Sequence, residues 1–87
     1  MRIPKRKAVA LRYRDGSDSA PRVVAKGDEA LADRIREVAQ EAGVPLYEDD
    51  ALVEVLAQIE LDHEVPPELY QAVAEVLSWI YKANNSL

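Results

Sequence analysis

The sequence predicts a small α+β domain in which a three-stranded mixed sheet, built from a hairpin and a strand–helix–strand crossover, packs with three helices. Residues 7–13 alternate large side chains with small or charged ones, which is the period of a strand with one buried face. Between residues 28 and 80, apolar residues recur three and four positions apart, as in helices that face a core. The 87 residues suffice for one such core, so a single domain is expected.

The first elements along the chain should form the hairpin. Residues 14–21 follow the strand at 7–13 and concentrate Gly, Asp, Ser and Pro, which all favour turns. Residues 22–26 then form a second short strand. A loop of this composition between two strands predicts a long hairpin connection.

A helix and a third strand are expected next. Asp28 offers a carboxylate to the free amides of a helix start. The apolar spacing then continues until Gly43 supplies a left-handed stop, so the helix is predicted over residues 28–42. Residues 44–47 are short and apolar and are interpreted as a third strand, joined in parallel through a right-handed crossover, with Pro45 at its first residue or edge.

Two more helices complete the chain. Asp49 or Asp50 can cap the second helix, which should end before Pro66. Pro67 suits the first turn of the last helix, because its missing N–H would have no partner there anyway. The predicted organisation is a flexible basic arm over residues 1–6, the domain over residues 7–83 and a frayed end over residues 84–87.

Charge is distributed unevenly along the chain. The net charge is −5, but residues 1–26 hold eight Lys and Arg against two acids, whereas residues 27–87 hold three against fourteen. We interpret the basic end as a solvated tail on an acidic domain. The alternative is a nucleic-acid-binding module, which phosphate contacts would make strongly salt-dependent. Its basic residues would be Arg2, Lys5, Arg6, Lys7, Arg12 and Arg14.

Catalytic and metal chemistry find few candidates. There is no cysteine, which excludes disulfides, thiol nucleophiles and thiolate metal sites and fits a cytoplasmic protein. The lone His63 lies between two acids before a Pro-Pro turn and is interpreted as a solvated loop residue. The acids at 48–50 lack the spacing of a calcium loop, and Lys26 with Gly27 is read as a strand-to-helix turn rather than a phosphate cradle. No catalytic residue, metal or cofactor is expected, and the apolar run at 8–11 is too short for a signal peptide or membrane span.

Five blocks in order, at matching spacing, resemble a known family. They are residues 4–13, 20–27, 31–37, 43–45 and 65–77. Together they are similar to the C-terminal cytoplasmic domain of the FlhB/YscU family, the export-switch proteins of flagellar and virulence type III secretion. The resemblance covers almost the whole chain.

The family's self-cleavage motif, Asn-Pro-Thr-His, falls here on Ile3, Pro4, Lys5 and Arg6, so one of its four residues is kept. In the family the Asn side-chain amide attacks its own backbone carbonyl, and Ile3 has no such nitrogen. Arg6 stays protonated and cannot act as a base near neutral pH. The resemblance therefore implies a protein without self-cleavage and without enzymatic activity, similar to the cleaved fragment, whether made as a separate gene product or excised from a longer chain.

The resemblance also implies partners. We expect a monomeric component or accessory of the export apparatus that binds secretion substrates, their chaperones or the membrane-anchored partner half, at the cytoplasmic face of the export gate. A sheet that lacks one edge strand could receive that strand from a partner. One departure is the acidic segment at 49–54, where the family usually carries Arg, which should weaken a partner that docks on a basic surface.

The implied substrate-binding patch is apolar and made of four residues, Ala20, Pro21, Ala74 and Leu77. Ala74 and Leu77 are three apart and so share one helix face, independently of the resemblance. Tyr70 and Tyr81 can border the same face, and Trp79 is interpreted as half-buried. For Leu77 an ordinary core position is an equally good interpretation.

Overall fold

The structure is a computed structural model that describes residues 6–14 and 16–85, with side chains described as far as residue 78. The predicted hairpin is present: β1 (Lys7–Arg12) pairs antiparallel with β2 (Arg22–Asp28). Ala10 lies opposite Ala25 but Leu11 lies opposite Val23, so a bulge interrupts the register between them.

In the part of the chain that the structure describes, the sheet has two strands. The prediction of a third strand at residues 44–47 is therefore wrong, and so is the predicted parallel crossover. Residues 44–49 form an exposed coil. The turn after α1 and an ion pair of 2.7 Å between Arg36 and Glu48 hold this coil beside the helix. Pro45 has no N–H to donate to a ladder, so it adds nothing to strand pairing at this segment.

A different segment lies beside β2. Val23 donates its N–H to the carbonyl of His63 at 3.1 Å and accepts from Asp62 at 2.7 Å, and Val65 donates to Pro21 at 2.8 Å. A single antiparallel bridge joins Arg22 to Glu64. Residues 62–65 therefore occupy the edge of β2 near its start, without forming a full strand.

The first helix, α1 (Glu29–Glu41), is one residue shorter at each end than predicted. Asp28 is not its side-chain cap: it is the last residue of β2, and the chain turns at Glu29, which has a φ of 53°. At the other end Gly43, with a φ of 73°, donates to Gln40 and Val44 donates to Ala39. These two hydrogen bonds are the Schellman motif that the glycine predicts.

The second helix, α2 (Asp50–Leu56), begins with Asp49 as its cap, because the Asp49 carboxylate accepts from the backbone N–H of Leu52 at 3.0 Å. A short 3-10 turn, η1 (Pro67–Leu69), leads directly into α3 (Tyr70–Asn85). The last helix thus continues two residues past the expected domain end at residue 83.

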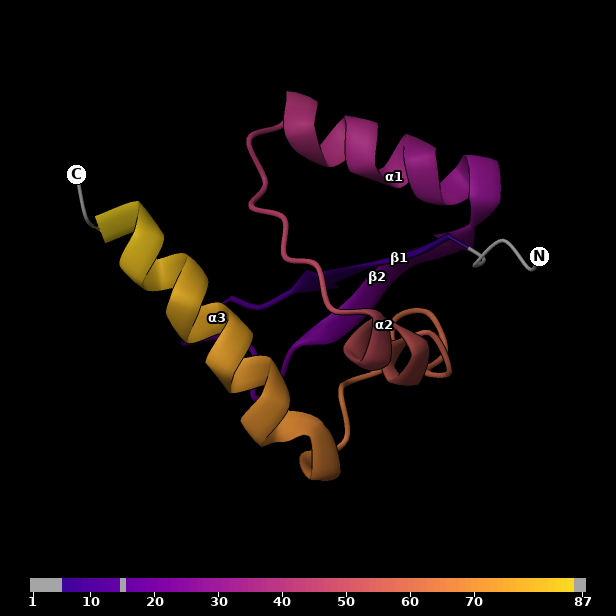
Figure 1. Cartoon of the computed structure of the whole chain (residues 1–87). Coiled ribbons are helices and arrows are strands. Elements are labelled where there is room, and N and C mark those ends of the chain that lie inside the picture. The colour runs from indigo at the N-terminus through magenta and orange to yellow at the C-terminus, as the bar shows by residue number, and fades with distance from the viewer. Residues whose placement is uncertain (1–5, 15, 86–87) are drawn as a thin grey trace.

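Figure 1 shows the hairpin between α1 on one side and α2 with α3 on the other. On the α1 side the strands carry small residues: Ala8 pairs with Gly27, and a Cβ added to Gly27 would lie 2.4 Å from Cγ of Leu31. This close approach requires glycine. On the other side the buried cluster of Leu56, Val65 and Val73 forms the core, against which Val9, Leu11, Leu52, Ile59, Leu69 and Leu77 pack.

Within residues 6–14 and 16–85, none of the helices combines the length and the hydropathy that crossing a bilayer would need.

Candidate binding pocket

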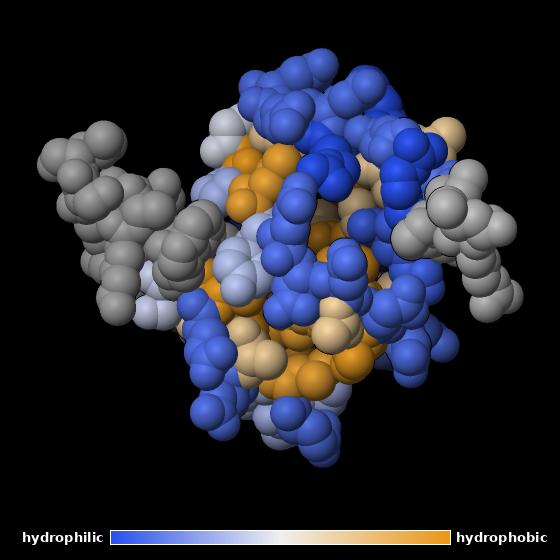
Figure 2. Space-filling view, in the orientation of Figure 1, coloured by the Kyte–Doolittle hydropathy of each residue, from blue (hydrophilic) through white to orange (hydrophobic). Residues whose placement is uncertain are grey.

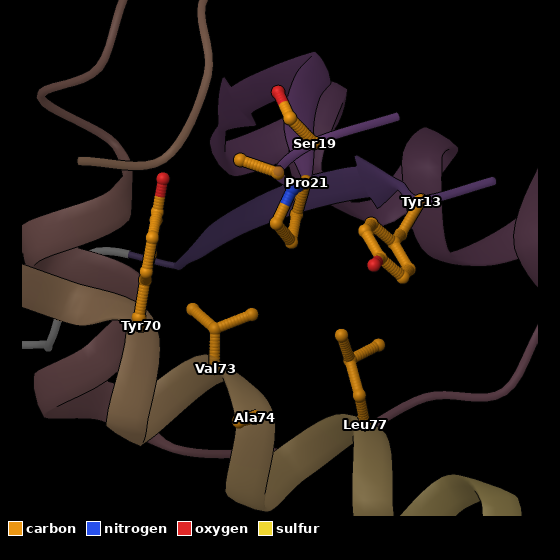
Figure 3. Close-up of a pocket in the computed structure, with 8 residues that line it drawn as sticks. Tyr13, Ser19, Pro21, Tyr70, Val73, Ala74 and Leu77 are labelled. Carbon is orange, nitrogen blue, oxygen red and sulfur yellow. The ribbon is translucent and has the colours of Figure 1, made fainter. Parts of the chain in front are cut away.

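The four residues predicted to form an apolar patch come together in one hollow. Ala20 and Pro21 lie at the end of the hairpin loop, and Ala74 and Leu77 lie on the facing side of α3 (Figure 3). The hollow has a volume of about 310 Å³. That is at the lower end of the range of small-ligand pockets, and it is large enough for one or two apolar side chains.

Helix α3 supplies half of the wall. The lining residues Tyr70, Val73, Ala74 and Leu77 are spaced by three and four positions and so share one face. Val73 is buried in the core and forms part of the floor, while Ala74 is exposed. Leu77 is half-buried, and its side chain both packs against the core cluster and lines the hollow.

The hairpin loop supplies the opposite wall. Ala20 and Pro21 are almost fully buried, so they offer a fixed surface rather than a mobile one. The Pro21 carbonyl accepts from Val65, and the Ser19 hydroxyl donates to Glu64 at 3.1 Å. These bonds tie the loop to the segment beside β2 and so fix the position of this wall.

Polar groups are few and uncharged. The eight described lining residues include the hydroxyls of Tyr13, Ser19 and Tyr70 but no ionisable acid, lysine, arginine or histidine. Figure 3 shows Tyr13 and Tyr70 at opposite ends, with Pro21 above the helix residues. The Ser19 hydroxyl is already bonded to Glu64, and the rest of the lining is mostly apolar, so the hollow is suited to binding an apolar group.

Sequence reasoning identified part of this lining. Tyr70 was expected near the patch, and it lies there, whereas the side chain of Tyr81 falls outside the described residues, as does that of Trp79. Tyr13 and Ser19 were missed. The signal available for them was their position, since they lie at the two ends of the loop that delivers Ala20.

The degenerate cleavage-motif positions are only partly visible. Ile3, Pro4 and Lys5 lie outside the described residues. Arg6 is exposed and forms ion pairs with Asp33 at 3.3 Å and Glu29 at 3.8 Å, at the start of α1. Its guanidinium therefore joins the start of β1 to the first turns of α1.

Other basic residues of the hairpin are also engaged. Lys7 pairs with Glu54 at 3.1 Å, and Arg12 lies 3.9 Å from Asp18. Since each of these cations already faces an acid, less positive charge is left for a nucleic acid than the sequence indicates.

Lys26 has a role that the sequence did not predict. Its ammonium group donates to the carbonyls of Ala57 at 3.1 Å and Ile59 at 2.8 Å. These carbonyls lie just after α2, where the negative end of the helix dipole stabilises a cation. Lys26 therefore holds the end of α2 against the hairpin.

Two of the three acids at residues 48–50, and His63, have local partners. Asp49 caps α2, Glu48 pairs with Arg36, and the exposed His63 lies 3.5 Å from Glu60. Among the side chains that the structure describes, no three potential ligands gather around one point.

Comparison with known proteins gives consistent matches. The family model described as "FlhB HrpN YscU SpaS Family" matches residues 3–80. The chain is 48% identical over 84 residues to the uncharacterized protein YlqH of Bacillus subtilis, covering 97% of this chain and 90% of that protein. It is 44% identical over 80 residues to the flagellar biosynthetic protein FlhB of Escherichia coli, covering 91% of this chain but 21% of FlhB.

Solved structures agree with the fold. The PscU C-terminal domain superimposes with a TM-score of 0.83 at 38% identity, covering 88% of this chain and 99% of that one. The cytoplasmic domain of FlhB from Shewanella putrefaciens gives a TM-score of 0.83 at 34% identity, covering 90% of this chain and 61% of that one.

Proposed function

The chain belongs to the FlhB/YscU family, and from this premise we propose that it is a non-enzymatic component or accessory of a flagellar or type III protein export apparatus. It would act in the cytoplasm, beside the export gate, and bind export substrates, their chaperones or the membrane-anchored half of an FlhB-type protein. The observation that carries the proposal is the hollow itself. Two pairs of positions more than fifty residues apart in sequence, Ala20 with Pro21 and Ala74 with Leu77, line one uncharged recess.

The recess suits the apolar side chain of an extended or helical segment. Its walls are fixed by backbone hydrogen bonds, so binding should cost little reorganisation. The hydroxyls of Tyr13 and Tyr70 at its ends can accept or donate one hydrogen bond each to the backbone of such a segment. Affinity would then come from the buried apolar contact, and orientation from the rim.

The open edge of β1 offers a second contact. The Glu29 N–H donates to the carbonyl of Arg6, so the backbone groups of Arg6 face β2. In an antiparallel pair every second residue faces the partner strand, so Ala8 and Ala10 face β2 as well. The backbone groups of Lys7 and Val9 accordingly point away from β2. An extended peptide from the cytoplasmic part of a membrane-anchored FlhB could pair there by strand addition. Unchanged backbone shifts in β1 on titration of that peptide would refute this part of the proposal.

We also infer that this chain does not cleave itself at residues 3–6. The support is chemical: Ile3 lacks the attacking amide, and Arg6 cannot act as a base. Intact-mass measurement after prolonged incubation should give one undivided species, and a fragment that begins at Pro4 would contradict the inference.

The deciding experiment is a quantitative pull-down against export substrates and against membrane-anchored FlhB without its C-terminal fragment. The test variant is Ala74→Asp, which puts a charge into the hollow from an exposed position. The matched control is Ala72→Asp, which is exposed on the same helix but does not line the hollow. Leu77→Asp is a second test, although it also disturbs the core.

We expect wild type and Ala72→Asp to bind alike and Ala74→Asp to lose binding by about ten-fold or more, since an unpaired carboxylate would be buried by the ligand. Equal loss in both variants would point to general acidity or misfolding. Binding unaffected by Ala74→Asp would exclude the hollow as the docking site.

A further inference from the structure

An exposed surface on the α1 side of the molecule has no role in the pocket. It consists of Val38, Val44, Leu46 and Tyr47, with Glu41, Glu48, Asp49 and Asp50 around them, and is called here the acidic–apolar surface. None of these residues lines the hollow between the hairpin loop and α3. Every residue from 41 to 50 is exposed.

The apolar part of this surface is brought together by the end of α1. The Val44 N–H donates to the carbonyl of Ala39, the residue after Val38, and in a Schellman motif the residue after the glycine commonly packs against this last turn of the helix. The ion pair between Arg36 and Glu48 then returns the coil toward α1. Figure 2 shows hydrophobic residues exposed beside α1 and bordered by hydrophilic ones.

The exposure of these side chains is large. The exposed fractions are 46% for Val38, 52% for Val44, 38% for Leu46 and 44% for Tyr47. Single exposed apolar residues are ordinary, but four large ones within ten positions are unusual enough to be examined as an interaction surface.

Charge identifies the kind of partner. Residues 37–50 contain five acids and no lysine or arginine. Glu37 and Glu48 are paired with Arg34 and Arg36 of α1. Among the described side chains, Glu41 and Asp50 have no cation within ion-pair distance. A partner with apolar residues on one side and cations at their margins would satisfy both features.

We propose that the acidic–apolar surface docks a basic amphipathic segment of a partner protein, with aliphatic side chains on Val38, Val44 and Leu46 and with Lys or Arg opposite Glu41 and Asp50. The charge complementarity would speed encounter and exclude acidic partners, while the buried apolar contact would supply affinity. This docking does not depend on the pocket, so either proposal can fail without the other.

The probe is a Leu/Lys peptide of about 18 residues, enough for about five helical turns with one apolar face. Two comparison peptides are a Leu/Glu version and a scrambled Leu/Lys version without an apolar face. Backbone chemical shifts and titration calorimetry on the full chain report the site and the affinity.

We expect the amphipathic Leu/Lys peptide to shift resonances of residues 38–50, and the other two to bind about ten-fold more weakly or not at all. Leu46→Ser and Glu41→Gln should each weaken binding. The matched controls Leu61→Ser and Glu60→Gln change an exposed leucine and an exposed glutamate outside the surface and should not. Ala74→Asp should leave peptide binding unchanged.

Several results would overturn the proposal. Equal binding of the scrambled peptide, or equal loss with Leu61→Ser, would show nonspecific attraction to an acidic protein. Shifts confined to α3 and the hairpin loop would place the peptide in the pocket instead. Shifts of residues 38–50 that grow with protein concentration, without peptide, would make a second copy the occupant.

Discussion

Replacing Lys26 by methionine removes the ammonium group that holds the end of α2 but keeps most of the aliphatic stem. The native side chain is partly buried and donates to the carbonyls of Ala57 and Ile59. These carbonyls follow a helix of seven residues whose last residue, Leu56, belongs to the core cluster. Loss of the two bonds should therefore loosen α2 and, through Leu56, the core.

The magnitude follows from two contributions. Hydrogen bonds from a charged donor contribute about 1.5–3 kcal/mol each when the freed partner stays buried. The two carbonyls released by Lys26→Met lie at a helix end that water can reach. We therefore take the lower part of this range as the loss for both hydrogen bonds together. A cation at a helix C-terminus adds about 0.3–1 kcal/mol. We expect unfolding free energy to fall by about 2–3 kcal/mol, which lowers Tm by about 4–8 °C per kcal/mol in a domain of this size.

The matched control is Lys7→Met. Lys7 is on the same hairpin, and its ammonium group contacts only the exposed carboxylate of Glu54 among the described side chains. Such surface pairs contribute about 0–1 kcal/mol. Urea unfolding, with the slope held to the same value for all variants, measures both changes. If Lys26→Met costs no more than Lys7→Met, the reasoning about α2 is wrong.

Three further changes test particular contacts. Gly27→Ala should lower the free energy of unfolding by about 1–3 kcal/mol, because the added Cβ overpacks against Leu31. Adding Leu31→Ala to the same chain should restore only part of this loss, because the Leu31 Cβ would still lie 2.9 Å from the new methyl group. Strictly additive effects of the two changes would refute the close approach. Asp49→Ala should lower the free energy of unfolding by about 0.5–2 kcal/mol, because it removes the cap of α2. Asp49→Asn keeps a capping oxygen, so in a thermal melt it should retain most of the wild-type stability. Val65→Ala should cost about 2–3 kcal/mol in urea unfolding, whereas the exposed Val55→Ala should cost less than about 1 kcal/mol.

The candidate pocket was predictable only in part. Ala74 and Leu77 could be assigned to one helix face because their spacing matches the helical period. Ala20 and Pro21 were added to them through the family resemblance. The burial of both residues, and the hydrogen bond between Pro21 and Val65, arise only in the tertiary structure. The expectation that these positions bind a partner stays a prediction.

Elements with strong local signals were predicted closely. The Gly, Asp and Ser of residues 14–21 specify the hairpin loop, Gly43 ends α1 with a left-handed residue, and Pro67 begins the turn into α3. Each of these depends on the backbone preference of one or a few adjacent residues, so the sequence alone determines it.

The tertiary structure decided which segments occupy the edges of the hairpin. Residues 44–47 have the composition of a strand, yet they lie exposed beside α1, and the less apolar segment 62–65 pairs with the start of β2. Likewise Lys26 reaches carbonyls more than thirty residues away, and Gly27 is needed only because α1 passes close to it. Such outcomes depend on competition between distant segments for the same hydrogen bonds and space, and local preferences carry no information about that competition.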